Sequence, residues 1–413
     1  MASVNRVPGG VTAAKGYRAA SCAAGIKYKG RTDMALLVSD VPAAAAAVFT
    51  SNVMKAAPVI WDRNNITSCG KVQAVVVNSG IANACTGEEG LESCRRSAEA
   101  VSAALGIPAE YVAVGSTGVI GMPLPDDRII NGINMMIPAL SDSIEAGTAA
   151  ARAIMTTDTV KKEFAYSFVT SDGKTVTVGG MSKGSGMIHP NMCTMLCYVT
   201  TDMAIDRALI DEALHGAVDS SFNMITVDGD TSTNDTLILM ANGLAGNKEV
   251  TEKDSDYDLF REALGLLTTD LAKLMARDGE GATKRIEMRV LGADTLAHAK
   301  VLAKSVVGSN LTKAMIFGKD ANCGRVLCAL GYSGIEFDPA KVDLWFVDPA
   351  GDRKLLLYTG GKFTGYDEED AVTYMEGEEV VMACDMHMGE ASAVAWGCDL
   401  TYDYVKINAD YRS

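Results

Sequence analysis

Apolar residues follow two different periods along the chain, and segments of the two kinds alternate. The run Val72–Val77 is rich in valine, which is typical of a buried β-strand. The segment Leu91–Leu105 repeats its apolar residues every three or four positions, as on one face of a helix. Strand-like and helix-like segments in alternation predict an α/β or α+β fold.

The same patterns predict the other main elements of the chain. Further helices are expected at Gly132–Met155, Asp206–Ser220, Tyr257–Arg277 and Ala293–Val307. Strands are expected at Ala35–Val38, Tyr111–Gly115, Thr175–Gly180, Met195–Thr200, Leu237–Met240, Arg285–Val290, Asp343–Val347 and Val380–Cys384.

The net charge excludes several classes of partner. The 413 residues carry a formal net charge of −15, and this length allows two or three domains. Residues 1–193 have 17 basic and 15 acidic side chains, whereas residues 194–413 have 20 and 37, so the acidity lies in the second half. Because no basic run and no apolar stretch of about 18 residues occurs, we expect neither nucleic-acid binding nor a membrane span.

Cysteine and histidine are not spaced as metal ligands. The ten cysteines include no CxxC pair, and the four histidines form none of the usual zinc patterns, so no metal site is expected. Buried, reduced thiols are typical of a cytoplasmic protein. The first residues also lack the apolar stretch of a signal peptide, which favours the same location.

A glycine-rich loop in the middle of the chain leads directly into an apolar strand that starts near Thr194. Lys183 precedes the glycines and a strand follows them, which is the wrong order for a phosphate-binding loop. A Thr at the start of a strand can be a nucleophile if a cut before it frees its α-amine as the base. On composition alone, an ordinary strand residue is the favoured interpretation of Thr194, and the nucleophile is a conjecture.

The segment from Lys183 to Leu196, KGSGMIHPNMCTML, resembles the signature of the ornithine acetyltransferase family. That family makes arginine precursors and cleaves itself before a Thr. Blocks in the family's order cover nearly the whole chain, namely residues 78–87, 116–121, 155–159, 226–235, 278–284, 317–325 and 408–413. Two positions differ from the family's usual pattern, because Cys193 stands where Ala is usual and Ile81 where Asn is usual.

The resemblance implies a layered α/β sandwich that cleaves itself between Cys193 and Thr194. Residues 1–193 would then form an α chain and residues 194–413 a β chain, and the two would fold together. It also implies a ping-pong reaction in which acetylornithine acetylates Thr194, ornithine leaves and glutamate takes the acetyl group as N-acetylglutamate.

Roles for other residues follow from the same resemblance. Thr117 and Gly118, expected in a turn after the strand Tyr111–Gly115, would stabilise the oxyanion of the tetrahedral intermediate. Lys183 would contact a substrate carboxylate and Glu280 the ornithine ammonium. Substrate contacts are completed by Thr157, Asn408 and Ser413, with Thr156 as a neighbour of Thr157. His189 is expected to order its turn by hydrogen bonding rather than to act as the base.

The resemblance implies no cofactor, and an assembly of two α and two β chains. It leaves open whether acetyl-CoA is a second acetyl donor. Two other functions remain on the residues alone. An uncleaved small-molecule-binding protein could use the glycine-rich loop to close a pocket, and a related self-cleaving amidase or aminopeptidase would share the nucleophile but hydrolyse peptides.

Overall fold

The computed structural model describes residues 3–189 and 195–410, which form two compact units. Unit 1 comprises Met1–Gly184, Pro190–Asn223 and Thr231–Ala272, and unit 2 comprises Ser185–His189, Met224–Asp230 and Lys273–Ser413. Each unit therefore contains residues from both of the expected chains. The expected cleavage site, Cys193 and Thr194, lies outside the described residues, as does Ser413.

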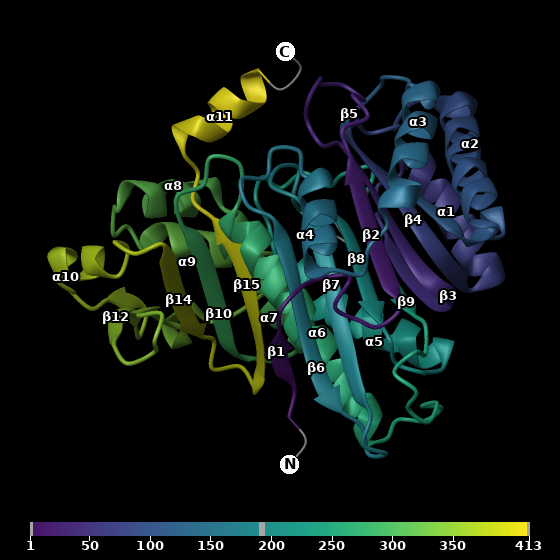
Figure 1. Cartoon of the computed structure of the whole chain (residues 1–413). Helices are drawn as coiled ribbons and strands as arrows, with labels where there is room; N and C mark the ends of the chain where they lie inside the picture. The colour runs from purple at the N-terminus through teal and green to yellow at the C-terminus, as the bar shows by residue number, and fades with distance from the viewer. Residues whose placement is uncertain (1–2, 190–194, 411–413) are drawn as a thin grey trace. The chain divides into compact units, whose positions relative to one another are not determined.

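A nine-stranded mixed sheet is the centre of unit 1 (Figure 1). Its strand order is β1-β6-β7-β8-β9-β3-β4-β5, and β2 pairs with β3 beside this path. The pairs β4–β5 and β8–β9 are parallel, and the other neighbours are antiparallel. The strands are β1 (Asn5–Val7), β2 (Tyr17–Cys22), β3 (Met34–Phe49), β4 (Lys71–Ile81), β5 (Val112–Val119), β6 (Lys162–Val169), β7 (Thr175–Lys183), β8 (Leu196–Thr201) and β9 (Thr236–Ala241).

Helices bury both faces of this sheet, which explains the apolar run in β4. Val75 and Val77 belong to one core cluster together with Ala150 of α4. The residues between them in sequence, such as Val76, belong to a second cluster with Ile133 of α3. The helices of unit 1 are α1 (Ala57–Cys69), α2 (Gly87–Leu105), α3 (Asp126–Met136), α4 (Ile144–Ala153), α5 (Arg207–Ser220) and α6 (Ser255–Arg277), the last of which belongs to this unit as far as Ala272.

The single helix predicted for Gly132–Met155 is wrong, because the segment holds the end of α3, a short 3-10 turn and α4. Pro138 lies in the turn and has no N–H to continue the α-helical hydrogen bonds of α3. A new helix then begins after Ser143, whose Oγ accepts the N–H of Ala146 as an N-cap. The buried residues of α3 and α4 lie at positions that would share one face of a continuous helix, so the spacing alone does not reveal the break.

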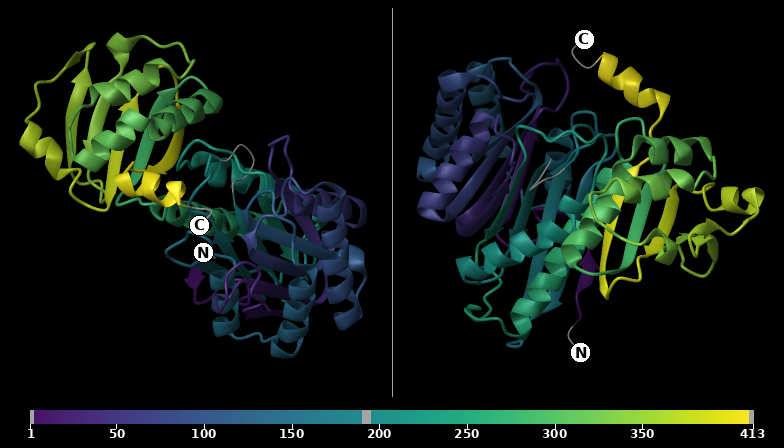
Figure 2. Two further views of the ribbon diagram at one scale, coloured as in Figure 1. Left: turned by 90° about the horizontal axis from the view of Figure 1, so that it is seen from above. Right: turned by 180° about the vertical axis from the view of Figure 1, so that it is seen from behind.

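Unit 2 has a six-stranded sheet of order β13-β12-β11-β14-β10-β15. Helix α7 packs against β10 and β15, and Figure 2 shows this helical layer in green beside the green to yellow strands. Both units are thus layered α/β structures, and the predicted fold class is confirmed. The elements are β10 (Arg285–Ala293), β11 (Asp343–Val347), β12 (Lys354–Thr359), β13 (Lys362–Phe363), β14 (Glu379–Asp385), β15 (Ala391–Cys398), α7 (Leu296–Gly308), α8 (Asn310–Gly318), α9 (Gly324–Gly331), α10 (Glu368–Thr373) and α11 (Tyr402–Ala409).

Three general properties concern the residues that the structure describes. Their nine cysteines are free thiols. Within residues 3–189 and 195–410, no group of three or more His, Cys, Asp or Glu side chains is arranged to hold a metal ion. None of the helices in these ranges is long and apolar enough to span a bilayer.

Candidate functional site

Thr117 and Gly118 lie inside β5, so the turn expected at this position is wrong. The strand continues to Val119 because β4 also continues and pairs Gly80 with Gly118, next to an irregularity at Ile81. Gly118 has a φ of +128°, and a Cβ there would overlap the backbone of Gly80. Only glycine allows the two strands to approach so closely at this point.

Two buried asparagines hold the backbone around Thr117. The Ser116 hydroxyl donates to Asn78 Oδ1 at 2.7 Å, beneath the end of β4. Asn234 Nδ2 donates to the carbonyl oxygens of Ser116, at 2.9 Å, and Ala82, at 2.5 Å. The carboxyl ends of the parallel strands β4 and β5 are therefore fixed by side-chain amides, and a parallel pair of this kind often presents its ligand site at this edge.

Lys183, at the end of β7, reaches the side chain of Thr117. Its Nζ lies 3.2 Å from Thr117 Oγ1, and Lys183 is only 9% exposed. An ammonium group can only donate, so the Thr117 oxygen must accept in this contact. The hydroxyl hydrogen of Thr117 is then directed elsewhere, and Thr117 can donate it to an oxyanion. The structure thus brings together two of the expected site residues.

Asp158 lies behind this pair and receives three hydrogen bonds. Its Oδ1 accepts Lys162 Nζ at 2.7 Å and the N–H of Gly184 at 2.7 Å, and its Oδ2 accepts the N–H of Thr156 at 3.1 Å. Burial by itself raises the pKa of Asp158, but the charges of Lys162 and Lys183 and the hydrogen bonds together hold the pKa well below its usual range. Asp158 is therefore a carboxylate at neutral pH.

Thr156 and Thr157 belong to the short loop between α4 and β6, and both are half-buried. The guanidinium of Arg31 donates to the carbonyl oxygens of Met155, at 2.6 Å, and Thr156, at 2.9 Å. Asp158 anchors the loop from the other side through the Thr156 N–H. Thr157 therefore directly follows a residue whose N–H and carbonyl oxygen are both held by side chains.

Glu280 and Asn408 lie together in unit 2. Glu280 is 6% exposed, and its Oε2 accepts Asn408 Nδ2 at 2.8 Å. The N–H of Glu280 donates to Ser185 O at 2.9 Å, and a Cβ added to Gly186 would overlap the Glu280 carboxylate. The glycine therefore allows the loop to lie directly against this carboxylate.

Asn408 comes from α11, a helix with no buried residue. Its Nδ2 also donates to Tyr404 O at 3.1 Å, within the helix. Burial and the nearby charges of Asp228 and Glu280 raise the pKa of Tyr404, which keeps the phenol neutral. The Glu280 carboxylate is thus held by a side chain on an exposed helix rather than by the sheet.

Residues 185–189 form a strap along unit 2. Asp228 accepts the N–H groups of Met187, at 2.6 Å, and Ile188, at 2.8 Å. His189 Nδ1 shares a hydrogen bond of 3.0 Å with Thr226 Oγ1, so His189 makes the kind of contact expected of it. Burial, with a smaller effect from Lys304, lowers the pKa of His189 to about 4, and the imidazole is neutral at physiological pH.

The expected site residues thus fall into two described groups. One group, in unit 1, consists of Thr117 with its neighbour Gly118, of Lys183, which contacts Thr117, and of Thr157, whose loop is anchored by Asp158. The other, in unit 2, joins Glu280 and Asn408. The first group offers hydrogen-bond donors and cations, which suit an oxyanion or a carboxylate, and the second offers an anion, which suits an ammonium group.

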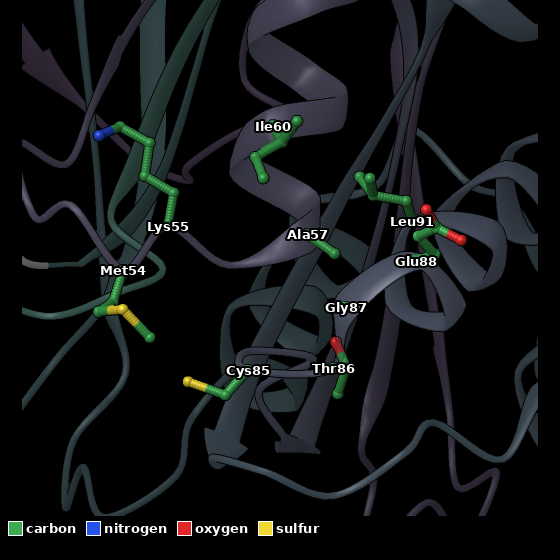
Figure 3. A pocket seen from close by; sticks show the side chains of 9 residues that line it. All are labelled: Met54, Lys55, Ala57, Ile60, Cys85, Thr86, Gly87, Glu88 and Leu91. Atoms are coloured by element: carbon green, nitrogen blue, oxygen red, sulfur yellow. The ribbon is translucent and has the colours of Figure 1, made fainter.

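A separate pocket of about 330 Å³ opens in unit 1 where the chain enters α2 (Figure 3). Figure 3 shows Ile60 of α1 and Leu91 of α2 among its lining residues, with Cys85 below them in this view. Cys85 has a φ of +57°, and Thr86 uses its hydroxyl on Asn83 rather than as an N-cap. Of the expected site residues that the structure describes, none lines this pocket.

The sequence alone predicts no role for five further residues of this region, namely Asp158, Lys162, Asn78, Asn234 and Asp228. All except Lys162 lie in blocks that carry the family resemblance, so their presence there was the available signal. What the sequence could not show is that Asp158, Lys162, Asn78 and Asn234 are buried, or that Asp228 accepts the backbone N–H groups of Met187 and Ile188.

Comparisons with known proteins agree on one family. The sequence model of the ArgJ family matches residues 18–413. The arginine biosynthesis bifunctional protein ArgJ of Symbiobacterium thermophilum is 54% identical over 98% of this chain and 99% of its own.

Two solved structures are also similar in sequence to parts of the chain. The crystal structure of arginine biosynthesis bifunctional protein argJ from Bacillus halodurans has 46% identity and a TM-score of 0.49, covering 51% of this chain and 97% of its own. An ornithine acetyltransferase from Mycobacterium tuberculosis, solved in complex with ornithine, has 43% identity and a TM-score of 0.43, covering 47% of this chain and 100% of its own.

Proposed function

The chain belongs to the ArgJ family, and on that premise we propose that it moves the acetyl group of acetylornithine to glutamate through an ester on Thr194. Its general activity, acetyl transfer in arginine biosynthesis, follows from the family and agrees with the expectation from the sequence. The cleaved bond, the acetyl carrier and the roles of the other site residues are the parts that we propose.

The reaction has two halves. Cleavage between Cys193 and Thr194 frees the α-amine of Thr194, which takes the proton of the Thr194 hydroxyl as the oxygen attacks the acetyl carbonyl. Thr117 and Gly118 donate to the oxyanion that forms, and ornithine leaves with the proton as an amine. The amine of glutamate then attacks the acetyl ester, which releases N-acetylglutamate and restores the Thr194 hydroxyl.

One structural observation supports these roles most directly, namely the contact between Lys183 and Thr117. It makes the Thr117 oxygen an acceptor toward lysine and leaves its hydrogen for the oxyanion. Lys183 also places positive charge where the α-carboxylate of a substrate can bind, with Thr157 beside it. Glu280 binds the ornithine ammonium and is oriented by its hydrogen bond from Asn408. Ser413 completes the substrate contacts.

Cleavage would leave the two chains joined by the sheet of unit 1. Strand β7 lies before the cleaved bond and β8 after it, and the two pair from Lys183 and Leu196 onward. Strand β9, also after the bond, pairs with β3. The α and β chains therefore remain one folded body, and we propose that two such bodies form an α2β2 enzyme in the cytoplasm. We also propose acetyl-CoA as a second acetyl donor, without any bound cofactor.

Two variants of Thr194 test this function. Thr194→Ala should remain a single chain close to the 43.4 kDa of the uncleaved protein and should not transfer acetyl groups, because cleavage and transfer need the same hydroxyl. Thr194→Ser, the matched control, keeps a hydroxyl and should still cleave. Intact mass spectrometry and acetyl exchange with labelled ornithine measure both. Fragments that end at Cys193 in Thr194→Ala, or a wild-type protein that stays whole and only binds ligand, would contradict the proposal.

The second donor needs its own measurement. Acetyl-CoA and glutamate are incubated with the cleaved protein, and the free thiol of CoA is followed together with N-acetylglutamate. Equal release of both products supports the second activity. Thiol release without N-acetylglutamate would be plain hydrolysis, and no release would restrict the enzyme to acetylornithine.

A further inference from the structure

We propose that Asp158 is the positioning residue of this acetyl-transfer site, and that its ion pair with Lys162 exists to hold the backbone beside Lys183 and Thr157. The inference rests on the proposed function and adds two residues to it. Neither residue contacts the reacting atoms in the proposed reaction, so both would act through the residues that do.

The three hydrogen-bond donors of Asp158 come from different places in unit 1. Lys162 is the first residue of β6, Gly184 directly follows β7, and Thr156 lies in the loop after α4. The sheet already pairs Lys162 of β6 with Ser182 of β7, and the Asp158 carboxylate adds the loop after α4 and the peptide that follows β7 to this pair. Two of these segments carry expected substrate-contact residues.

Two of these donors are backbone N–H groups, so Asp158 also holds two peptide groups. The N–H of Gly184 belongs to the peptide that links it to Lys183, and the N–H of Thr156 belongs to the peptide one residue before Thr157. A hydrogen bond to such an N–H fixes the orientation of the whole planar peptide. Asp158 therefore sets the direction in which the chain presents Lys183, and it anchors the loop that presents Thr157.

The side chains of Asp158 and Lys162 are both fully buried, at 0% exposure. A buried ion pair adds little stability compared with apolar residues of similar size, because both ions lose their hydration. A fully buried pair that only supported the fold would be an inefficient choice. Lys162 instead keeps Asp158 ionised, and an ionised carboxylate is what two backbone N–H groups need as an acceptor.

Protonation of Asp158 should therefore impair the site. The charged groups that face this carboxylate are Lys162 from β6 and Lys183 from β7. Both favour the ionised form, so protonation requires acid well below neutral pH in the wild type. The charge of Lys162 lowers the pKa of Asp158, whereas burial raises it. Without Lys162, the pKa of Asp158 should therefore rise, because burial favours the neutral acid. Acetyl transfer should then be lost at a higher pH than in the wild type.

The first experiment compares Lys162→Met with the wild type. The acid limb of kcat/KM for glutamate should move up by about one pH unit or more. Lys161→Met is the matched control, since it removes a cation one residue away whose partner is the carboxylate of Glu163. The control should keep the wild-type limb. An unchanged limb in folded Lys162→Met, or the same shift in Lys161→Met, would overturn the proposal.

Because an unpaired buried charge can prevent folding, a neutral double variant is needed. Asp158→Asn with Lys162→Met removes both charges and should recover most of the melting temperature that either single change loses. Its kcat/KM should still fall about tenfold or more at every pH, since one amide oxygen replaces a carboxylate that held two peptides. Recovery of activity together with the melting temperature would show that the pair only supports the fold.

Failure of this inference can be told from failure of the proposed function. The wild type and Lys161→Met, assayed in the same series, must cleave before Thr194 and transfer acetyl groups if the proposed function is right. If they do and the Lys162 variants behave like them, only the role of Asp158 is lost.

Discussion

The two groups of site residues are held in opposite ways. Around Lys183 in unit 1, the side chains come from strands or from a loop that is anchored at Thr156, and the ion pair between Asp158 and Lys162 is fully buried. Around Glu280 in unit 2, the carboxylate is buried, but its side-chain partner Asn408 comes from α11, which buries no residue. One group is built into a sheet, and the other is completed by an exposed helix.

This difference has a consequence for catalysis. Groups that stabilise an oxyanion must be in place before charge develops, because they lower the activation barrier most when they need not reorganise during the reaction. A group that reads the side chain of a substrate must instead let ornithine leave and glutamate enter. Exposed elements open locally at a small free-energy cost, so α11 can adjust while the sheet stays fixed. We therefore expect changes in the first group to affect the rate and changes in the second to affect substrate choice.

The largest effect is expected at Thr117. Thr117→Val keeps the shape of the side chain and removes the hydroxyl, and it should lower kcat by about 10²–10³-fold with little change in KM. Thr117→Ser, which keeps the hydroxyl, should recover most of the rate. Steady-state kinetics of both half-reactions provide the test. A change limited to KM would mean that Thr117 binds the ground state and would weaken the contrast between the two groups.

A smaller and selective effect is expected at Glu280. Glu280→Gln keeps the size of the side chain and removes its charge, and it should weaken the ornithine half-reaction by about 2 kcal/mol, near 30-fold. The half-reaction with glutamate, which brings a carboxylate instead of an ammonium, should suffer less. Acetyl exchange measures each half separately. Equal losses in both halves with a lower melting temperature would instead mark Glu280 as structural support.

A weaker effect of the same kind is expected at Asn408. Asn408→Ala removes one hydrogen bond between the exposed helix α11 and Glu280. The ornithine half-reaction should therefore weaken by about 0.5–1.5 kcal/mol, up to about tenfold. Lys406→Ala on the same helix is the control and should have no effect on either half. A loss in Asn408→Ala as large as that in Glu280→Gln would mean that α11 is as firmly fixed as the sheet.

The last expected effect concerns the pH dependence of stability rather than acetyl transfer, in the strap of residues 185–189. The pKa of His189 is about 4 in the folded protein and about 6.5 without burial, so the unfolded chain binds the proton more tightly. Stability should therefore fall as the pH drops from 6.5 toward 4. His189→Gln removes this contribution, and melting curves across that range should show a shallower fall. An identical pH dependence in both proteins would rule out His189 as a titrating group.

Local patterns predicted much of the fold, and the reason is that they report burial. The valine run at Val72–Val77 lies within β4, and the periodic segment Leu91–Leu105 lies within α2. The helix expected at Tyr257–Arg277 is the greater part of α6. In each case the element is long and its apolar period is clear, so local sequence and tertiary burial favour the same structure.

Other elements could not be read in this way. Helix α11 has only eight residues and buries none of them, so it is too short for an apolar period to be recognised. The segment Gly132–Met155 looked continuous because the pattern outweighed the single Pro138. The turn expected at Thr117 and Gly118 was wrong because glycine is common in turns, whereas here it allows two strands to approach.

The sequence by itself determined the family, the layered α/β class and the identity of the residues that could carry acetyl transfer. Only the tertiary structure decided which of them meet. Lys183 contacts Thr117 from 66 residues away, and Asn408 contacts Glu280 from 128 residues away. Asp158 and Lys162 are four residues apart, yet nothing local shows that their ion pair is buried. Contact and burial depend on how distant segments pack, and the free energy that fixes a polar side chain in a buried place comes from that packing.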